Sequence, residues 1–431
     1  MNGVAGGGGT IPPRDPETLT ALCLRRLLPL LVVAYVVSFV DRTNIALAKS
    51  HLQTDLGISA AAYGLGAGLF FLTYALTEVP SNMVMHRVGA RRWITRIMVS
   101  WGVISGLMAV VQGPTSFYVL RMLLGVAEAG LFPGVMLYLT YWFGAEHRAR
   151  ASGLFLLGVC LANVISGPLG GALLEMNGVL GLRGWQWLFI LEAVPALVVA
   201  AVIWRRLPDR PRDAPWLTAE EAAGIERRIS RQQLEAAPSH EGLGRALLGP
   251  QSLLTIGVYF CHQIAIYTVT FFLPGIIGGW GHLSPLSIGS LTALPWLAST
   301  AGAVFALRGR RTPLQARRVL VAGLLIMASG MLVASERQPA LALLGFCISA
   351  SMFFVVQALI FTYPASRLSG PRLAIGLAFT NSCGLLGGFT GPTIMGRIEQ
   401  QTGSATGGLI AMTILLVVAA GLASRLRPVS T

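Results

Sequence analysis

The sequence has few charged residues for a chain of its length. Asp, Glu, Lys and Arg make up 12% of the 431 residues, about half the share found in soluble domains. So few charges cannot cover a soluble surface, and hydrophobic residues reach 54%. The scarcity of charge therefore excludes the two or three soluble domains that the length alone would suggest.

Cysteine is also scarce, and the patterns of common enzyme sites are missing. Four of the five cysteines lie inside apolar runs and Cys23 lies just before the first, which is typical of small buried side chains and not of a disulfide framework. The sequence contains no HExxH motif, no Cys or His cluster with metal spacing, and no phosphate-binding glycine loop followed by lysine. We therefore expect no enzyme activity, metal or cofactor.

The positive charge that is present is distributed as in a membrane protein. The formal net charge of +14 would suit nucleic acid, but the basic residues fall in short clusters between apolar runs. Of the 32 Lys and Arg residues, 25 lie in the predicted inner segments and 4 in the predicted outer loops. The positive-inside rule thus places both termini in the cytoplasm, in a multi-pass protein of the cell (inner) membrane. No nucleic-acid partner is expected.

Twelve apolar stretches are long enough to cross a membrane, because about 20 residues span roughly 30 Å of hydrocarbon. They are predicted to be helices, since lipid admits only a backbone with satisfied hydrogen bonds and the short alternating strands of a barrel are absent. The predicted fold is an all-α membrane protein with twelve transmembrane helices in two six-helix bundles. The predicted spans are 26–48, 62–84, 93–111, 116–140, 151–173, 187–204, 252–275, 286–307, 319–335, 340–362, 373–395 and 406–424.

The longest connection, residues 205–251, divides the chain into two halves. The N-terminal bundle is predicted over 26–204 and the C-terminal bundle over 252–424, with a disordered cytoplasmic tail over 1–25 and a second cytoplasmic tail over 425–431. The first apolar run is too long for a cleaved signal peptide, so we expect it to be retained. Within the connection, Thr218 and Glu221 form a capping box that predicts a polar helix through Glu235 at the cytoplasmic surface.

Glycine and proline recur at corresponding places in the two halves. The marks are Gly167, Pro168, Gly170 and Gly171 in the fifth span, and Gly387, Gly388, Gly391 and Pro392 in the eleventh. They are consistent with an internal duplication and with bends near a central pathway. Small residues that allow close helix packing explain the same marks equally well.

Four charged residues lie deep within predicted spans, where each is costly and therefore indicates function. Asp41 and Arg42 in the first span lie at a depth similar to Arg121 in the fourth, and Glu128 follows two turns later on the same helix face. Arginine suits a carboxylate, and a carboxyl group in an apolar cavity can carry a proton. We predict Asp41 and Glu128 as proton-coupling groups and Arg42 and Arg121 as anion ligands. The alternative is two structural salt bridges.

Several uncharged polar side chains also fall within spans. His262 and Gln263 lie near the middle of the seventh span and are candidate substrate ligands, although such a histidine can equally be hydrogen-bonded to a neighbouring helix. Glu78, close to the inner end of the second span, is expected to belong to a cytoplasmic charge cluster. Like His262, four further polar side chains can either bind substrate or hydrogen-bond to a neighbouring helix: Tyr74, Asn163, Gln357 and Asn381.

With these residues in view, the chain resembles the major facilitator superfamily and, within it, the anion:cation symporter family of tartrate, phthalate and hydroxyphenylacetate permeases. The resemblance covers about residues 20–425. It rests on VDRTN (40–44), EVPSN (78–82), HRVGARRW (86–93), RMLLGVAEAGLFPG (121–134), YLTYWF (138–143), HRARA (147–151) and GWQWLFILE (184–192).

The resemblance implies a role for each matching position. Asp41 and Glu128 match the family's proton-coupling acids, Arg42 a substrate or gating arginine, and Arg121 the superfamily's arginine of the fourth span. Tyr74 and Asn381 match positions that contact substrate in sugar-acid members. A monomer is implied. Departures at His86, Val159, loop 308–318 and FFVVQ (353–357) put the inner gate and the substrate identity in doubt.

Two functions remain open from the sequence. The first is proton-coupled uptake of a small carboxylate by alternating access, with a hydroxy acid, an aromatic acid and a sugar acid all possible as cargo. Protons are preferred to sodium because the acids stand singly and not in an oxygen-rich cage. The second is a proton-driven efflux pump, but drug pumps of the superfamily carry two residues between the proline and the glycine of the fifth span, where this chain has one between Pro168 and Gly170.

Overall fold

The computed structural model describes residues 14–235, 247–306, 312–367 and 370–427, and in these ranges the regular structure is entirely helical. Eleven segments of this part of the chain are long and apolar enough to cross a membrane. A further 33-residue helix, α15, covers the predicted eleventh span, so the predicted fold class is confirmed. The helices are α1 Pro16–Leu56, α2 Ala60–Val88, α3 Ala90–Leu107, α4 Pro114–Glu128, α5 Leu131–Thr140, α6 Ala145–Leu174, α7 Gly184–Arg206, α8 Ala219–Glu235, α10 Pro250–Gly278, α11 Pro285–Ala306, α12 Pro313–Ala334, α13 Pro339–Ser351, α14 Phe353–Arg367, α15 Gly370–Thr402 and α16 Thr406–Ser424, with short 3-10 turns at Met108–Val110, Val179–Gly181 and Pro211–Asp213.

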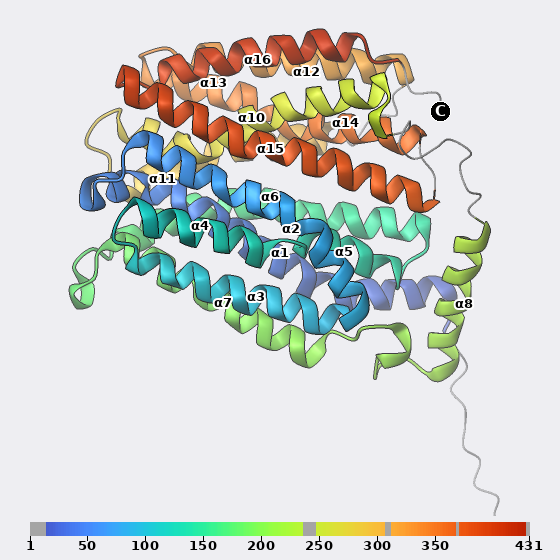
Figure 1. Cartoon of the computed structure of the whole chain (residues 1–431). Helices are drawn as coiled ribbons and strands as arrows, with labels where there is room; N and C mark the ends of the chain where they lie inside the picture. The colour runs from blue at the N-terminus through green and yellow to red at the C-terminus, as the bar shows by residue number, and fades with distance from the viewer. Residues whose placement is uncertain (1–13, 236–246, 307–311, 368–369, 428–431) are drawn as a thin grey trace, which may run out of the picture.

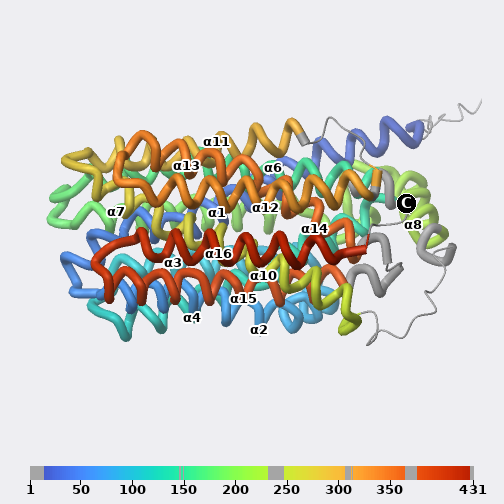
Figure 2. Tube along the Cα trace, turned by 90° about the horizontal axis from the view of Figure 1, so that it is seen from above, coloured from blue at the N-terminus to red at the C-terminus, as the bar shows by residue number. Residues whose placement is uncertain are grey.

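The helices form a long bundle in which the two halves of the chain lie side by side. In Figure 1 the helices α12, α15 and α16 form the upper part and α3, α4 and α7 the lower part, while Figure 2 shows the same bundle from above. Helix α8 lies across one end. The first and last described segments of the chain both lie at that end, where Arg14 bonds to Glu221 in α8, and the backbone of Arg427 bonds to Gln251 at the start of α10. Because both ends of the described chain lie at the same end of the bundle, the chain crosses the membrane an even number of times.

The predicted capping box at the start of α8 is confirmed. The Thr218 amide donates to Glu221 at 3.0 Å and the Glu221 amide to the Thr218 hydroxyl at 3.3 Å. Glu221 also accepts a bond of 2.8 Å from Arg14. Burial raises the pKa of the Glu221 carboxyl, but the Thr218 amide and the Arg14 guanidinium outweigh it, so this pKa lies below its usual value.

The first helix is longer at both ends than predicted. It begins at Pro16, capped by Asp15, whose carboxylate accepts from the Thr18 amide at 2.8 Å. Residues 16–25 are therefore helical where the sequence suggested a disordered tail, and residues 1–13 lie outside the described part. At its other end α1 contains Lys49, which lies just beyond the predicted first span (26–48) and is one of the four basic residues assigned to the outer loops. Its ammonium group is buried and pairs with Glu399 of α15 at 2.6 Å.

Close helix packing explains the glycines of the fifth and eleventh spans. Both helices run unbroken through Pro168 and Pro392. In α6, a methyl group at Gly167 would collide with the Gly289 carbonyl of α11, and one at Gly171 would lie 2.9 Å from the Cα of Leu286. Helices α2 and α15 approach in the same way near Gly64. The glycines thus allow each half to press against the other along two helix pairs.

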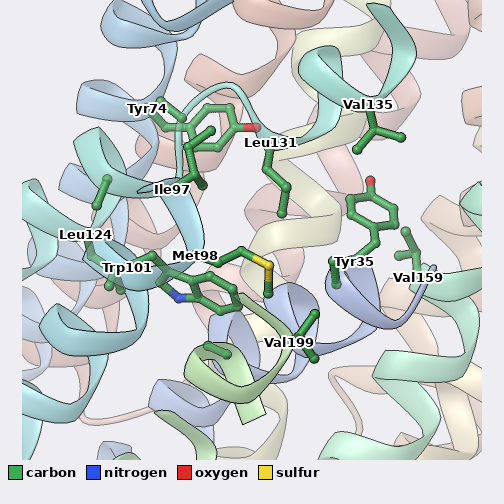
Figure 3. Packing of buried hydrophobic residues seen from close by; sticks show 14 of the residues in the cluster. Tyr35, Tyr74, Ile97, Met98, Trp101, Leu124, Leu131, Val135, Val159 and Val199 are labelled. Carbon is green, nitrogen blue, oxygen red and sulfur yellow. The ribbon is translucent and has the colours of Figure 1, made fainter. Parts of the chain in front are cut away.

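Each half has an apolar core. In the N-terminal half, side chains from α1 to α7 converge around Trp101, which has no exposed surface. Figure 3 shows Met98 beside the indole, with Leu131 and Tyr35 farther along the same cluster. The C-terminal core gathers α10, α12, α13, α14 and α16. Polar groups inside these cores must find partners within the protein, and these partners define the candidate site.

Candidate functional site

Two of the predicted spans, at corresponding places in the two halves, depart from a continuous helix near their middle. The fourth span is interrupted between α4 and α5, where Gly130 takes a left-handed conformation with φ of 95°. The tenth departs only slightly, because Met352 between α13 and α14 keeps helical backbone angles. The sequence analysis predicted both spans as continuous. A discontinuous helix marks the substrate pathway in many transporters.

Side chains from neighbouring helices bond to backbone carbonyls at both places. Ser81 of α2 donates its hydroxyl to the Ala129 carbonyl at 2.6 Å, and a methyl group at Gly130 would collide with the same serine. At the second place, Nε2 of His262 lies 3.0 Å from the Phe353 carbonyl. His262 has no exposed surface. This position favours the second of its two interpretations, a hydrogen bond to the next helix.

The centre of the site is an ion pair at the interruption of the fourth span. Glu128 is the last residue of α4, and one of its carboxylate oxygens accepts from both the Arg42 guanidinium of α1 and the Ser38 hydroxyl, the latter at 2.7 Å. The Arg42 guanidinium also lies over the rings of Phe39, at 4.6 Å, and Tyr74, at 5.5 Å. Aromatic faces attract such a cation.

This ion pair leaves hydrogen-bonding capacity unused. The second oxygen of Glu128 and the Nε of Arg42 are buried and have no hydrogen-bond partner among the described residues. Groups of this kind are rare in a finished protein core, because each lost hydrogen bond costs about 1–3 kcal/mol. The pair is therefore suited to exchange partners.

Asp41, next to Arg42 in the chain, takes a different set of partners. Its carboxylate accepts from the Trp101 indole at 2.6 Å, from the Asn44 amide at 3.1 Å and from the Ser105 hydroxyl. All three donors are uncharged. Asp41 is 1% exposed, and its carboxyl group takes these hydrogen bonds from α1 and α3 and none from an arginine.

Among the described residues, Arg121 is a buried cation that forms no ion pair with an acid. Its guanidinium donates to the carbonyls of Gly66 and Ala67 in α2, each at 3.2 Å, and lies 4.9 Å from the Phe70 ring. Among the four charged residues, Arg42 and Glu128 thus form a salt bridge, whereas Asp41 and Arg121 are each hydrogen-bonded to uncharged groups. This arrangement differs from the alternative of two structural salt bridges.

A second polar cluster joins the two halves, and the sequence analysis misplaced its acid. Glu78 of α2 is 2% exposed and accepts from Ser382 at 2.9 Å and Asn381 at 3.3 Å, both on α15. Asn381 in turn accepts from the Tyr259 hydroxyl of α10 at 3.4 Å, and the Gln357 amide of α14 donates to that hydroxyl. Glu78 is therefore part of the interface between the halves and not of a cytoplasmic charge cluster.

The remaining predicted ligands lie on α10 and α6. Gln263 is 4% exposed and its side-chain oxygen has no hydrogen-bond partner in the described part of the chain. Asn163 donates to the Val159 carbonyl of its own helix at 2.9 Å. Tyr267, which the sequence analysis overlooked, packs against Phe71 of α2 with ring centres 4.1 Å apart and ring planes tilted by 49°, and it lies beside Arg42. Tyr267 is therefore a residue of the C-terminal half that lies beside the ion pair of Arg42 and Glu128.

The charged groups are closed off in this conformation. Asp41, Arg121 and Glu128 are each 1% exposed and Arg42 is 7% exposed. Contact with an aqueous ligand therefore requires the halves to move. Among the residues that the structure describes, no group of three His, Cys, Asp or Glu side chains is placed to hold a metal ion.

Comparison with known proteins identifies the fold family. The model of the Major Facilitator Superfamily matches residues 31–392. The chain belongs to this superfamily. A protein of Agrobacterium vitis named "Putative tartrate transporter" is 41% identical over 396 residues, which cover 92% of this chain and 88% of that protein. A "Quinolone resistance transporter" of Acinetobacter baumannii is 37% identical over 399 residues, which cover 91% of each.

Solved structures agree on the fold. An inward-facing bacterial homologue of the human lysosomal transporter Spinster superposes with a TM-score of 0.73 at 20% identity, covering 96% of this chain and 98% of that one. The resemblance to the anion:cation symporter family is confirmed by the relatives, and the protein is a multi-pass membrane transporter and not an enzyme.

Proposed function

We propose that this superfamily member takes up a small organic anion together with a proton, by alternating access of a site at Arg42 and Glu128. The observation that carries the proposal is the buried ion pair between these residues. A guanidinium that already binds one carboxylate has the geometry to bind another. The cargo and Glu128 would then compete for the same cation.

This competition would couple the anion to the proton. When Glu128 takes up a proton, its negative charge disappears and Arg42 is left as a buried cation, which is costly without an anionic partner. A carboxylate from the cargo restores the pairing. By thermodynamic reciprocity, the bound anion also favours the protonated form of Glu128. Proton and anion would therefore be carried together.

The second polar cluster supports a cargo with hydroxyl groups. Asn381, Tyr259 and Gln357 are uncharged hydrogen-bonding groups on three helices of the C-terminal half. Sites that hydrogen-bond a hydroxyl discriminate strongly against analogues that lack it. Together with the relative named for tartrate, they favour a hydroxy acid or sugar acid over an aromatic acid. Asp41 is proposed as a second proton-coupling group, with Arg121 offsetting its charge.

The test is transport by the purified protein in proteoliposomes with an imposed pH gradient. We expect a hydroxy carboxylic acid from a panel that includes tartrate, aromatic acids and sugar acids to accumulate on the alkaline side, and a protonophore to abolish the accumulation. Asp41→Asn and Glu128→Gln should abolish gradient-driven accumulation, and full accumulation by both would refute their coupling role. Arg42→Ala should weaken anion binding, and unchanged affinity would refute the anion site.

Efflux is the second candidate, and one observation favours it. The relative of Acinetobacter baumannii is named for quinolone resistance. A pump would expel a drug against its gradient, and it would not require the arginine that faces a carboxylate cargo. Drug sensitivity of cells with and without the transporter separates the two candidates, since uptake of a small anion predicts no change in resistance.

A further inference from the structure

A third carboxyl group lies buried beside the charged residues already described. Glu192 is on α7, inside the predicted sixth span, and is 4% exposed. Neither of its carboxylate oxygens has a hydrogen-bond partner among the described residues. The sequence analysis gave this residue no role, and the mechanism proposed above does not use it.

The surroundings of Glu192 are apolar except on one side. A methyl group built on Gly170 of α6 would lie 3.7 Å from one of its oxygens, with Leu47 and Leu188 next to it. These leucine side chains give the carboxyl group no hydrogen bond.

The polar side is α1, which brings Asn44 and Asp41 toward Glu192. The Asn44 amide donates to Asp41 at 3.1 Å, so this side chain stands between the two acids. Asp41 is the titratable group that faces Glu192, while Arg42 is engaged with Glu128 and Arg121 with the carbonyls of α2.

The two acids differ in the charge state that their surroundings tolerate. Asp41 has three donors, and a carboxylate with several hydrogen bonds can stay ionised in a core. For Glu192, the Asn44 amide is the donor that faces it, and no hydrogen bond of good geometry reaches either of its oxygens in the described part of the chain. An ionised carboxylate with so few partners is among the most costly groups to bury.

We propose that Glu192 is a proton-holding group of the transport cycle, which exchanges its proton with Asp41 across Asn44. The hydroxyl bond of the Glu192 carboxyl breaks, the proton passes to the Asp41 carboxylate, and the negative charge moves to Glu192. The Asn44 amide, released from Asp41 as that charge disappears, can turn to the new carboxylate. The inference rests on the proposed proton coupling and adds a residue to it.

The decisive experiment compares Glu192→Gln with the wild type in proteoliposomes. The glutamine keeps the size of the side chain and removes the exchangeable proton. For each proton no longer coupled, the accumulation driven by one pH unit falls about tenfold, since one unit is a tenfold difference in proton activity. We expect this fall, a pH profile of substrate exchange altered from the wild type, and partial recovery in Glu192→Asp.

Two further variants make the comparison specific. Asn44→Val leaves both acids in place and removes the side chain between them, and we expect the same loss of accumulation. Glu336→Gln changes an exposed acid of the α12–α13 loop and should transport as the wild type does. If Glu192→Gln does not fold, labelling of the wild type with a hydrophobic carbodiimide replaces it, because this reagent modifies protonated carboxyl groups in apolar sites. Modification of Glu192 at pH 7 is expected.

The outcomes separate this inference from the proposed function. If the wild type accumulates an anion in response to the pH gradient, but Glu192→Gln matches it in accumulation and in pH profile, Glu192 is only a packing residue and the inference is overturned. Failure to detect modified Glu192 in the carbodiimide experiment overturns it as well. If the wild type shows no response to the gradient, the proposed coupling itself is wrong.

Discussion

Neutralising Glu128 should strengthen the binding of an anion while abolishing its coupling to protons. In Glu128→Gln the Arg42 guanidinium loses the carboxylate that occupies it, and the glutamine oxygen can still accept from Ser38. The variant resembles the protonated wild type. In this variant, Arg42 can bind the anion without first breaking an ion pair with a carboxylate.

The size of the effect follows from the contact that is lost. A hydrogen bond to a charged group contributes about 1.5–3 kcal/mol, and each 1.4 kcal/mol corresponds to a tenfold change in affinity. The variant should therefore bind the anion roughly 10 to 100 times more tightly than the wild type, in which Arg42 is paired with Glu128.

Binding of a radiolabelled carboxylate that the wild type accumulates, measured on purified protein together with the protons taken up per bound anion, provides the assay. Anion binding should be accompanied by proton uptake in the wild type and by less proton uptake in Glu128→Gln. The exposed variant Glu336→Gln is the matched control and should follow the wild type. Weaker binding in Glu128→Gln, or proton uptake equal to that of the wild type, would refute the idea that cargo and Glu128 compete for Arg42.

Three further predictions concern the scaffold. Gly289→Leu would press a side chain into the α6 backbone, so thermal unfolding in detergent should show a loss of about 1–3 kcal/mol, whereas Gly421→Leu, with open space around it, should unfold as the wild type does. Glu399→Gln removes the partner of Lys49 and, because Glu399 is partly exposed, should lower the free energy of unfolding by about 1 kcal/mol. An engineered cysteine at the end of α10 that lies near Lys49 should then react faster with a thiol reagent. An unchanged reaction rate would show that this ion pair does not hold the halves together. The lowered pKa of Glu221 means that its contribution to the docking of α8 is present at neutral pH and is lost as pH falls through that lowered value; amide exchange in α8 should rise in acid, and in Glu221→Gln it should be raised already at pH 7.

The fold could be predicted from the sequence because it depends on one strong signal. Long apolar runs in a chain with little charge can only be membrane helices, and the described structure has them where the sequence placed them. The interruption at Gly130 was missed because it is short: α4 ends at Glu128 and α5 begins at Leu131. Ser81 satisfies the freed Ala129 carbonyl from another helix, and such tertiary compensation leaves no trace in a hydropathy pattern.

The site was predicted in composition but not in its pairing. The sequence indicated that Asp41, Arg42, Arg121 and Glu128 lie deep in the membrane, but depth alone does not show that Arg42 pairs with Glu128 and not with Asp41. Side-chain direction and the break after Glu128 decide this.

Two buried acids were misjudged for different reasons. Glu78 was placed by its position near a predicted helix end, although Asn381 and Ser382 of the other half hold it inside. Glu192 carried a readable signal, a single acid within an apolar run, and that signal alone would have marked it as a candidate.

The most direct test of the account is accumulation of a hydroxy carboxylic acid in proteoliposomes under an imposed pH gradient, compared between the wild type and Arg42→Ala. The account predicts accumulation by the wild type that scales with the gradient and disappears with a protonophore, and none by the variant. Equal accumulation by both proteins, or accumulation by the wild type that ignores the gradient, would contradict it.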